Sequence, residues 1–148
     1  MEIRELFLDD EITAQLIKMS QDWEAENNVY GYVANSIEHL EGRTIFGAYN
    51  NNKLVGYIFG KPETQEKTNA LISEGTVYFE VEELYVSKYY RNQGFGKALF
   101  AAMQERVKET GIEYIFLTSA NKDSRQIMNF YLNEVGMNTQ YAVFFKKI

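Results

Sequence analysis

The chain has no cysteine, a single histidine and a single proline among its 148 residues. Without cysteine it can form no disulfide, thiol nucleophile or thiolate metal site, and one histidine cannot build a histidine-based metal cluster. We therefore expect no metal cofactor, and hydrolysis by a Ser-His or Cys-His pair is poorly supported. The scarcity of proline and the eleven Tyr and ten Phe argue against disorder and for one folded domain over residues 1–148.

Basic side chains are also in the minority. Fifteen Lys and Arg against twenty-one Asp and Glu give a formal net charge of -6. This charge repels nucleic-acid phosphate and suits a cationic partner better, so we expect no nucleic-acid partner. No apolar run is long enough to span a membrane, and the N-terminal stretch MEIRELFLDDE lacks the apolar core of a signal peptide. We expect a cytoplasmic protein with no membrane partner.

The hydrophobic periodicity predicts an ordered alternation of strands and helices. A strand (2–8) precedes an acid-capped helix (9–26) and a shorter helix (31–40). The strands RTIFGAY and KLVGYIFG flank an asparagine run that favours a tight hairpin turn. After an exposed connection (61–76) come the strand VYFEVEELYV, a helix that starts at Phe95 and stops at Gly111, a strand (112–118), a short helix (123–135) and one or two closing strands. This order predicts an α+β fold with a mixed sheet and a late βαβ crossover.

A glycine-rich loop, RNQGFGK, lies at the strand-to-helix turn of this crossover. The first turn of a helix leaves about four backbone N–H groups unpaired, and the helix dipole adds roughly half a positive charge there, so anions bind. Gly94 and Gly96 have no Cβ and let a phosphate approach the amides, while Arg91 and Lys97 add positive charge. The arrangement favours a pyrophosphate, although two glycines can also serve only a tight turn.

Two common nucleotide-binding motifs do not match this loop. The dinucleotide fingerprint needs a third glycine or alanine where Leu99 stands, and it follows a continuously apolar strand, whereas this strand carries Glu80, Glu82 and Glu83. A Walker loop needs a four-residue gap between its glycines and a Lys-Ser/Thr pair, and this loop has neither.

The stretch VEELYVSKYYRNQGFGKALFAAM instead resembles the acetyl-CoA-binding motif of the GCN5-related N-acetyltransferases. That motif is a strand ending in Leu-Tyr-Val, a short loop, Arg/Gln-x-x-Gly-x-Gly/Ala and a long helix. The order of elements over the whole chain is also similar to that family's fold. The resemblance implies a mostly antiparallel, twisted central sheet of six to seven strands flanked by about four helices.

The resemblance further implies that acetyl-CoA is the cosubstrate and that its pyrophosphate binds the loop amides. Backbone groups of the preceding strand would pair with the pantetheine arm like an added strand. Asn121 resembles a family asparagine near the pantetheine, although an asparagine before a helix is as often only a cap. The cofactor-binding residues implied in this way are Leu84, Tyr85, Val86, Arg91, Asn92, Gln93, Gly94, Phe95, Gly96, Lys97, Ala98 and Asn121.

Transfer to an amine needs a neutral amine, a polarised carbonyl and a proton for the departing thiolate. Counted back from the glycine loop, Glu80 matches the glutamate base of the histone-acetylating members, and Glu82 lies one side-chain step nearer the thioester. Either could serve as base, or all the glutamates of this strand could be solvated charges. Strand alternation places Glu80 and Glu82 on one face and Glu83 on the other, unless a bulge intervenes. The backbone amide of Leu84 or Tyr85 is the expected partner of the carbonyl oxygen.

Tyr131 is the expected general acid, because the segment NFYLNEVGM resembles the family's tyrosine followed by a Gly-Phe pair. Gly136 lies one residue further from Tyr131 than in the family, and Met137 replaces the phenylalanine. Tyr131 could therefore be only a packed core residue. Trp23 completes the apolar stripe of the first long helix, and we expect it in the core, with the floor of an acceptor cleft as the alternative.

Together these observations predict an N-acetyltransferase that transfers the acetyl group by direct attack in a ternary complex. The acid excess favours a small cationic acceptor: a polyamine, an aminoglycoside or an amino-acid derivative. A protein lysine or N-terminal acetyltransferase is one alternative, and a non-catalytic coenzyme A-binding module is another. Homodimers are frequent in the family, so a dimer also stays open.

Overall fold

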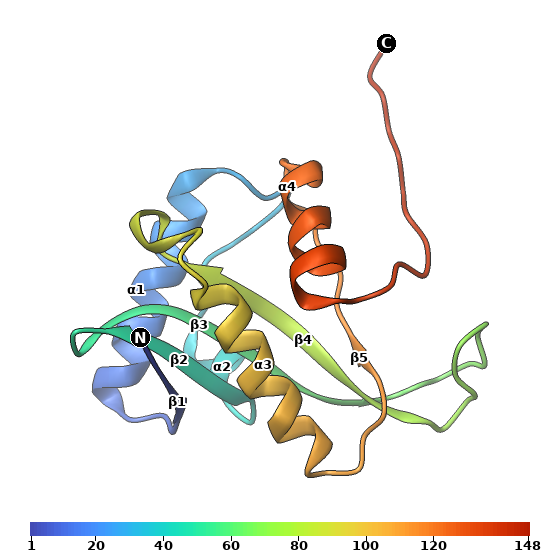
Figure 1. The fold of residues 1–148 in the computed structure, drawn as a ribbon, viewed down its shortest axis with the longest axis horizontal. Coiled ribbons are helices and arrows are strands. Elements are labelled where there is room, and N and C mark those ends of the chain that lie inside the picture. Colours follow the sequence, from blue (N-terminus) through green and yellow to red (C-terminus); the bar gives the residue numbers. More distant parts are fainter.

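One five-stranded sheet organises the fold (Figure 1). In the computed structural model, which describes residues 1–148, the strands follow the order β1-β2-β3-β4-β5. The first four pair antiparallel and β5 pairs parallel to β4, so the mixed sheet and the βαβ crossover are confirmed. The strands are β1 (Glu2–Leu6), β2 (Thr44–Asn50), β3 (Lys53–Thr64), β4 (Val77–Val86) and β5 (Ile115–Phe116).

Helices cover both faces of this sheet (Figure 1). They are α1 (Asp10–Glu26), α2 (Ile37–Leu40), α3 (Phe95–Lys108) and α4 (Ser124–Met128), and a π-helical segment (Asn129–Val135) continues α4. A 3-10 turn (Lys88–Tyr90) lies between β4 and α3. None of the helices has the length and apolar character that a membrane crossing requires.

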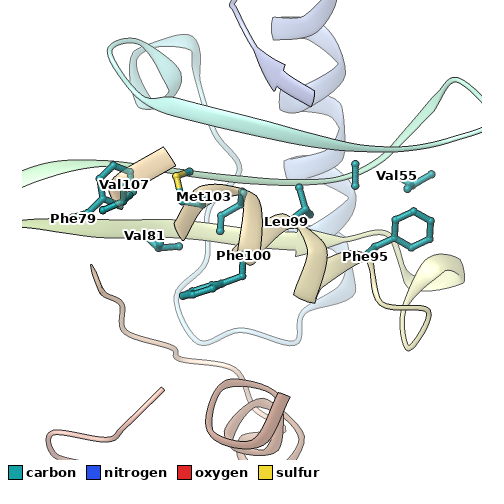
Figure 2. Close-up of a cluster of buried hydrophobic side chains, with 10 residues drawn as sticks. Val55, Phe79, Val81, Phe95, Leu99, Phe100, Met103 and Val107 are labelled. Carbon is teal, nitrogen blue, oxygen red and sulfur yellow. The ribbon is translucent and has the colours of Figure 1, made fainter. Parts of the chain in front are cut away.

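Each face of the sheet carries its own hydrophobic core. On one face, α3 inserts an apolar stripe between side chains of β2, β3 and β4 (Figure 2). Leu99 and Met103 of that stripe are fully buried, because residues four apart lie on the same side of a helix. On the other face, Leu16 of α1 and Leu40 of α2 pack on strand side chains that include Tyr57. The sheet is therefore fixed from both sides.

Local signals in the sequence account for several element boundaries. The carboxylate of Asp9 caps α1 by accepting from the amide of Ile12 at 2.7 Å. The β2-β3 turn places Asn51 and Asn52 in the left-handed region, with φ of 48° and 63°. Asparagine tolerates this conformation better than most residues, which confirms the predicted hairpin.

The second helix is shorter than predicted. Residues 31–36 are not helical, and α2 begins only after Ser36. Tertiary polar contacts hold this segment away from helical geometry: the amide of Asn35 donates to Ser20 Oγ at 2.9 Å, and its side chain donates to Glu83 Oε2 at 2.8 Å. His39 is exposed, and its Nδ1 accepts from the Ser36 amide. Partners from α1 and β4 thus override the local apolar period.

The predicted closing strands are also absent. Residues 138–148 form no strand and leave the sheet (Figure 1), and large apolar side chains such as Val143 and Phe144 are exposed. The preceding strand is short as well, since β5 covers two residues of the predicted 112–118. A two-residue strand offers no regular edge on which a further ladder could form. The sheet therefore has five strands and not the six to seven predicted.

A β-bulge in β4 decides which way its glutamates point. The register shifts between Phe59 and Gly60, so that Phe59 faces Glu83 and Gly60 faces Val81. Glu82 is the extra residue. Because a bulge reverses the alternation of side chains beyond it, Glu83 lies on the same face of the sheet as Glu82. The exception allowed for a bulge therefore applies: the bulge intervenes, and Glu83 does not point to the opposite face.

Gly60 allows β3 to approach this bulge. A Cβ at this position would lie 2.1 Å from Glu80 O, which is a backbone atom that cannot move aside. We predict that Gly60→Ala lowers the free energy of unfolding by about 1–3 kcal/mol, as overpacking does in well-packed interiors. Urea denaturation measures this loss. Gly47→Ala is the matched control, because the nearest atoms that its Cβ would meet are side-chain atoms of Leu6 and Leu54 and not backbone atoms. A larger loss of unfolding free energy in Gly47→Ala than in Gly60→Ala would contradict the role given to Gly60.

Candidate active site

A cleft opens where β5 diverges from β4. The two strands pair only at Phe79 with Ile115 and Glu80 with Phe116, whereas β4 continues to Val86 (Figure 1). Beyond the paired residues lie a larger cavity of about 950 Å³ and a smaller one of about 230 Å³. The two adjoin, since they share the lining residues Trp23, Leu84, Asn121, Ile127 and Tyr131.

The edge of β4 that faces this cleft has free backbone groups. Just past the strand, the Ser87 amide donates to Val55 O on β3 at 2.9 Å. Amides alternate between the two edges of a strand, so the Tyr85 amide also points to β3. The amides of Leu84 and Val86 therefore face the cleft. Of the two amides predicted to meet a carbonyl oxygen, this geometry favours Leu84.

The start of α3 forms the end wall of the larger cavity. Gly94 is the N-cap residue, with φ of 86°, a conformation that favours glycine. The first backbone bond of the helix runs from the Ala98 amide to Gly94 O at 3.0 Å. The amides of Phe95, Gly96 and Lys97 precede that bond and have no intrahelical acceptor. Three N–H groups and the positive end of the helix dipole thus meet at one wall of the cavity.

The two cations of the loop have different surroundings. Arg91 braces the loop, because its Nε donates to Val86 O at 2.8 Å and its guanidinium forms an ion pair with Glu26 at 2.8 Å. Lys97 is exposed and forms no ion pair. Lys97 is therefore the cation available to a bound anion, while Arg91 mainly positions the loop.

Most residues predicted to bind the cofactor come together around the larger cavity. Two do not line it: Gln93, whose side chain donates to Tyr89 O at 3.1 Å, and Ala98, whose amide is used within the helix. The ten that line it are Leu84, Tyr85, Val86, Arg91, Asn92, Gly94, Phe95, Gly96, Lys97 and Asn121.

The two glutamates predicted as bases occupy different positions. Glu82 lines the smaller cavity, and both of its carboxylate oxygens accept from Arg43, at 2.7 and 3.0 Å. Glu80 lines neither cavity. Burial, followed by the neighbouring carboxylates of Glu82 and Glu63, raises the pKa of Glu80. Glu82 therefore lines the cleft but is ion-paired, whereas Glu80 lies outside the lining of both cavities.

Glu83 is the carboxylate that the sequence reasoning passed over. Its Oε2 accepts from Tyr57 OH at 2.8 Å, from Asn35 Nδ2 at 2.8 Å and from Tyr32 OH at 3.2 Å. Burial raises the pKa of Glu83, and these three donors partly offset that effect. The bulge that turns Glu83 toward the smaller cavity is a property of strand pairing, so alternation along one strand could not reveal it.

An aromatic wall closes the cleft on the α1 side. The ring of Trp23 lies 4.3 Å from that of Tyr32 and 5.1 Å from that of Tyr85, centroid to centroid. Trp23 packs against the core on the α1 face, as expected, and also lines both cavities, as the alternative of a cleft position had it. Its Nε1 donates to Asn28 Oδ1 at 3.0 Å, which fixes the indole.

Tyr131 lines both cavities from the π-helical segment. A π-helix accommodates one more residue per turn than an α-helix and is frequent at functional sites. The segment ends at Gly136, with φ of 84°, where the Met137 amide donates to Tyr131 O at 2.8 Å. This wider turn absorbs the extra residue between Tyr131 and Gly136 that the sequence displayed. Burial raises the pKa of Tyr131 to about 12, so the hydroxyl keeps its proton at neutral pH.

Solved structures with the same fold include several acetyltransferases. An aminoglycoside acetyltransferase, meta-AAC0020 from an uncultured soil metagenomic sample, is 23% identical with a TM-score of 0.68, over 99% of this chain and 95% of that one. The aminoglycoside N-acetyltransferase AAC(6')-Iy in complex with CoA is 14% identical with a TM-score of 0.69, over 99% and 98%. A tetramutant of the BH1408 protein from Bacillus halodurans is 18% identical with a TM-score of 0.72, over the full length of both. These likenesses confirm the fold.

A comparison with curated protein sequences found no match. A comparison with protein families matches residues 2–137 to the acetyltransferase (GNAT) family, which is nearly the whole chain and contains the glycine loop, β4 and Tyr131. The chain therefore belongs to the acetyltransferase (GNAT) family.

Proposed function

We propose that this protein transfers the acetyl group of acetyl-CoA to a primary amine of a small cationic molecule. The observation that carries the proposal is the row of unpaired amides at the start of α3, which faces a cavity that adjoins a second cavity lined by two carboxylates. The modest volume of that second cavity, about 230 Å³, favours a small molecule over a protein acceptor. The fold is also shared with enzymes that act on aminoglycosides, which carry several amines.

The larger cavity suits coenzyme A. Its amides from Phe95 to Lys97 and the Lys97 ammonium match a pyrophosphate, because backbone donors at a helix start bind phosphate oxygens. The free edge of β4 at Leu84 and Val86 suits the amide groups of a pantetheine arm, as an extended ligand adds to an open sheet edge. Its volume of about 950 Å³ lies at the upper end of typical ligand sites of about 300–1,000 Å³.

Acetyl-CoA, when bound, supplies an activated acetyl thioester to which an amine can add directly in a ternary complex. The chain contributes three groups. The Leu84 amide is placed to donate to a carbonyl oxygen at the cleft. Tyr131 holds a proton that suits a departing thiolate, whose parent thiol has a pKa of about 8.5. Glu82, which lines the smaller cavity, or Glu80 acting through water, would remove a proton from the amine, whose pKa is about 10.

The proposed binding of phosphate by the amides at the start of α3 is tested by Gly94→Val. A β-branched side chain is strained at the φ of 86° and would disturb the amides at the helix start. We predict that affinity for CoA falls at least about tenfold, measured by calorimetry. Gly75→Val is the matched control, because Gly75 has a similar φ of 84° but lies in the 65–76 loop and lines neither cavity. Equal CoA affinity in the two variants would refute the proposal that these amides bind the pyrophosphate.

The general acid is tested by Tyr131→Phe, which removes only the hydroxyl. We predict that turnover falls by about 10²-fold or more while the affinity for CoA changes little. With a pKa of about 12, Tyr131 stays protonated over the assay range, so the wild type should show no loss of rate from this group up to about pH 10. Initial rates from pH 6 to 10 measure both. Undiminished turnover in Tyr131→Phe would leave the residue as core packing.

The base is tested by Glu80→Gln and Glu82→Gln. Removal of the base should lower turnover far more at neutral pH, where the amine is protonated, than near pH 10, where a large share of it is neutral. The variant with the pH-dependent loss identifies the base. A loss of the same size at every pH, in both variants, would indicate a structural role for these glutamates.

A further inference from the structure

The smaller cavity differs from the larger one in its chemistry. Aromatic and aliphatic side chains dominate its lining, and its carboxylates are Glu82 and Glu83 alone. Its aromatic residues Trp23, Tyr32 and Tyr131 come from α1, the segment between α1 and α2, and the π-helical segment. Thr118, Ser119 and Asn121 add neutral polar groups, so the lining suits an apolar body and supplies negative charge only through its two glutamates.

The negative charge in and near this cavity is largely compensated. Glu82 is ion-paired with Arg43 through both oxygens. Glu26, at the end of α1, is ion-paired with Arg91 and also accepts from Tyr85 OH at 2.8 Å. Of the two carboxylates that line the cavity, Glu83 is therefore the one without a cationic partner.

The two oxygens of Glu83 have unequal surroundings. Oε2 accepts all three hydrogen bonds, from Tyr32, Asn35 and Tyr57, whereas Oε1 accepts none. No buried side-chain nitrogen or oxygen lacks a hydrogen-bond partner, so the unpartnered Oε1 is reachable by solvent. One oxygen of the carboxylate is held by three donors, the other has no partner within the protein, and the residue lines the smaller cavity. This is the arrangement expected of a binding site for a single ammonium group.

We propose that the smaller cavity binds a compact monoamine with an aromatic or branched aliphatic body, whose ammonium group is held by Glu83 Oε1. The proposal rests on the proposed function, since the amine would be the acceptor, and it narrows the acceptor class. Polyamines and aminoglycosides carry several charges, and each further ammonium would need its own acid. At about 230 Å³ the cavity is also below the range of about 300–1,000 Å³ that houses drug-sized ligands.

The pH dependence of binding follows from the surroundings of this carboxylate. Tyr32, Tyr57 and Asn35 face Glu83 as donors, and Glu82 faces it as a neighbouring acid. Because burial raises its pKa, Glu83 takes up a proton at a higher pH than an ordinary glutamate. Affinity for an ammonium ligand should therefore fall as the pH is lowered through that raised pKa, while affinity for an uncharged analogue should not.

The test is calorimetry on protein saturated with CoA, which carries no acetyl group and so allows binding without reaction. The probes are 2-phenylethylamine, 2-phenylethanol, spermidine and the aminoglycoside sisomicin. We predict that 2-phenylethylamine binds at least about tenfold more tightly than each of the others. The alcohol lacks the charged hydrogen bond, which is worth about 1.5–3 kcal/mol. The polycations carry further ammonium groups that would each need an acid of their own. Tighter binding of either polycation, or equal binding of the amine and the alcohol, would overturn the proposal.

Glu83→Gln keeps the size of the side chain and removes its charge. This variant should lose about tenfold or more in affinity for 2-phenylethylamine and keep its affinity for CoA. The control is Glu66→Gln, which removes an exposed carboxylate that lines neither cavity and should leave both affinities unchanged. Unchanged amine affinity in Glu83→Gln would overturn the proposal. If the variant does not fold, the comparison of amine with alcohol on the wild type decides.

Turnover with acetyl-CoA separates this proposal from the proposed function. Acetylation of spermidine or sisomicin, but not of 2-phenylethylamine, would overturn the monoamine proposal and support the proposed function. Absence of CoA binding would overturn the proposed function itself. Acetylation of 2-phenylethylamine, with a raised KM and a smaller change in kcat for Glu83→Gln, supports both.

Discussion

The early divergence of β5 from β4 is the constraint on which the rest of the site depends. Two residue pairs hold β4 and β5 together at one end. The hydrophobic cores on the two faces of the sheet keep β4 in place along its remaining length. An unpaired strand edge inside a folded protein is costly unless its amides find partners. Here the edge borders two adjoining cavities, so its partner is solvent and, in the proposed function, the pantetheine arm of the cosubstrate. The fold thus maintains a row of free donors at the place where the helix start of α3 adds three more.

The bulge in β4 adds the chemical asymmetry of the cleft. It turns Glu83 to the side of α1, where polar groups from α1, the 27–36 segment and β3 have converged. The extra residue in the bulge, Glu82, forms an ion pair with Arg43. On the opposite wall, the π-helical segment directs Tyr131 into both cavities. Two local irregularities of the backbone, and no unusual residue type, therefore bring Glu83 and Tyr131 into the lining of the same cavity.

The sequence predicted the parts of this molecule that depend on local signals. The periodicity of apolar residues and the capping residues predicted α1, α3 and β4, and the asparagine turn predicted the β2-β3 hairpin. The glycine loop predicted the helix start that lines the larger cavity. The sequence could not predict features that depend on pairing between distant segments. The direction of Glu83 depends on Gly60 across the sheet, and the extended segment before α2 depends on Ser20 and Glu83. The C-terminal aromatic run has strand propensity, but no strand edge pairs with it in the fold.

The central claim is that free amides at the start of α3 and along β4 bind coenzyme A. Backbone amide NMR on ¹⁵N-labelled protein tests it most directly, because each amide reports its own hydrogen bond. On titration with CoA, the account predicts the largest shifts at Phe95, Gly96 and Lys97, and further shifts at Leu84 and Val86. No response at these amides at saturating CoA, or a response confined to the opposite face of the sheet, would contradict it.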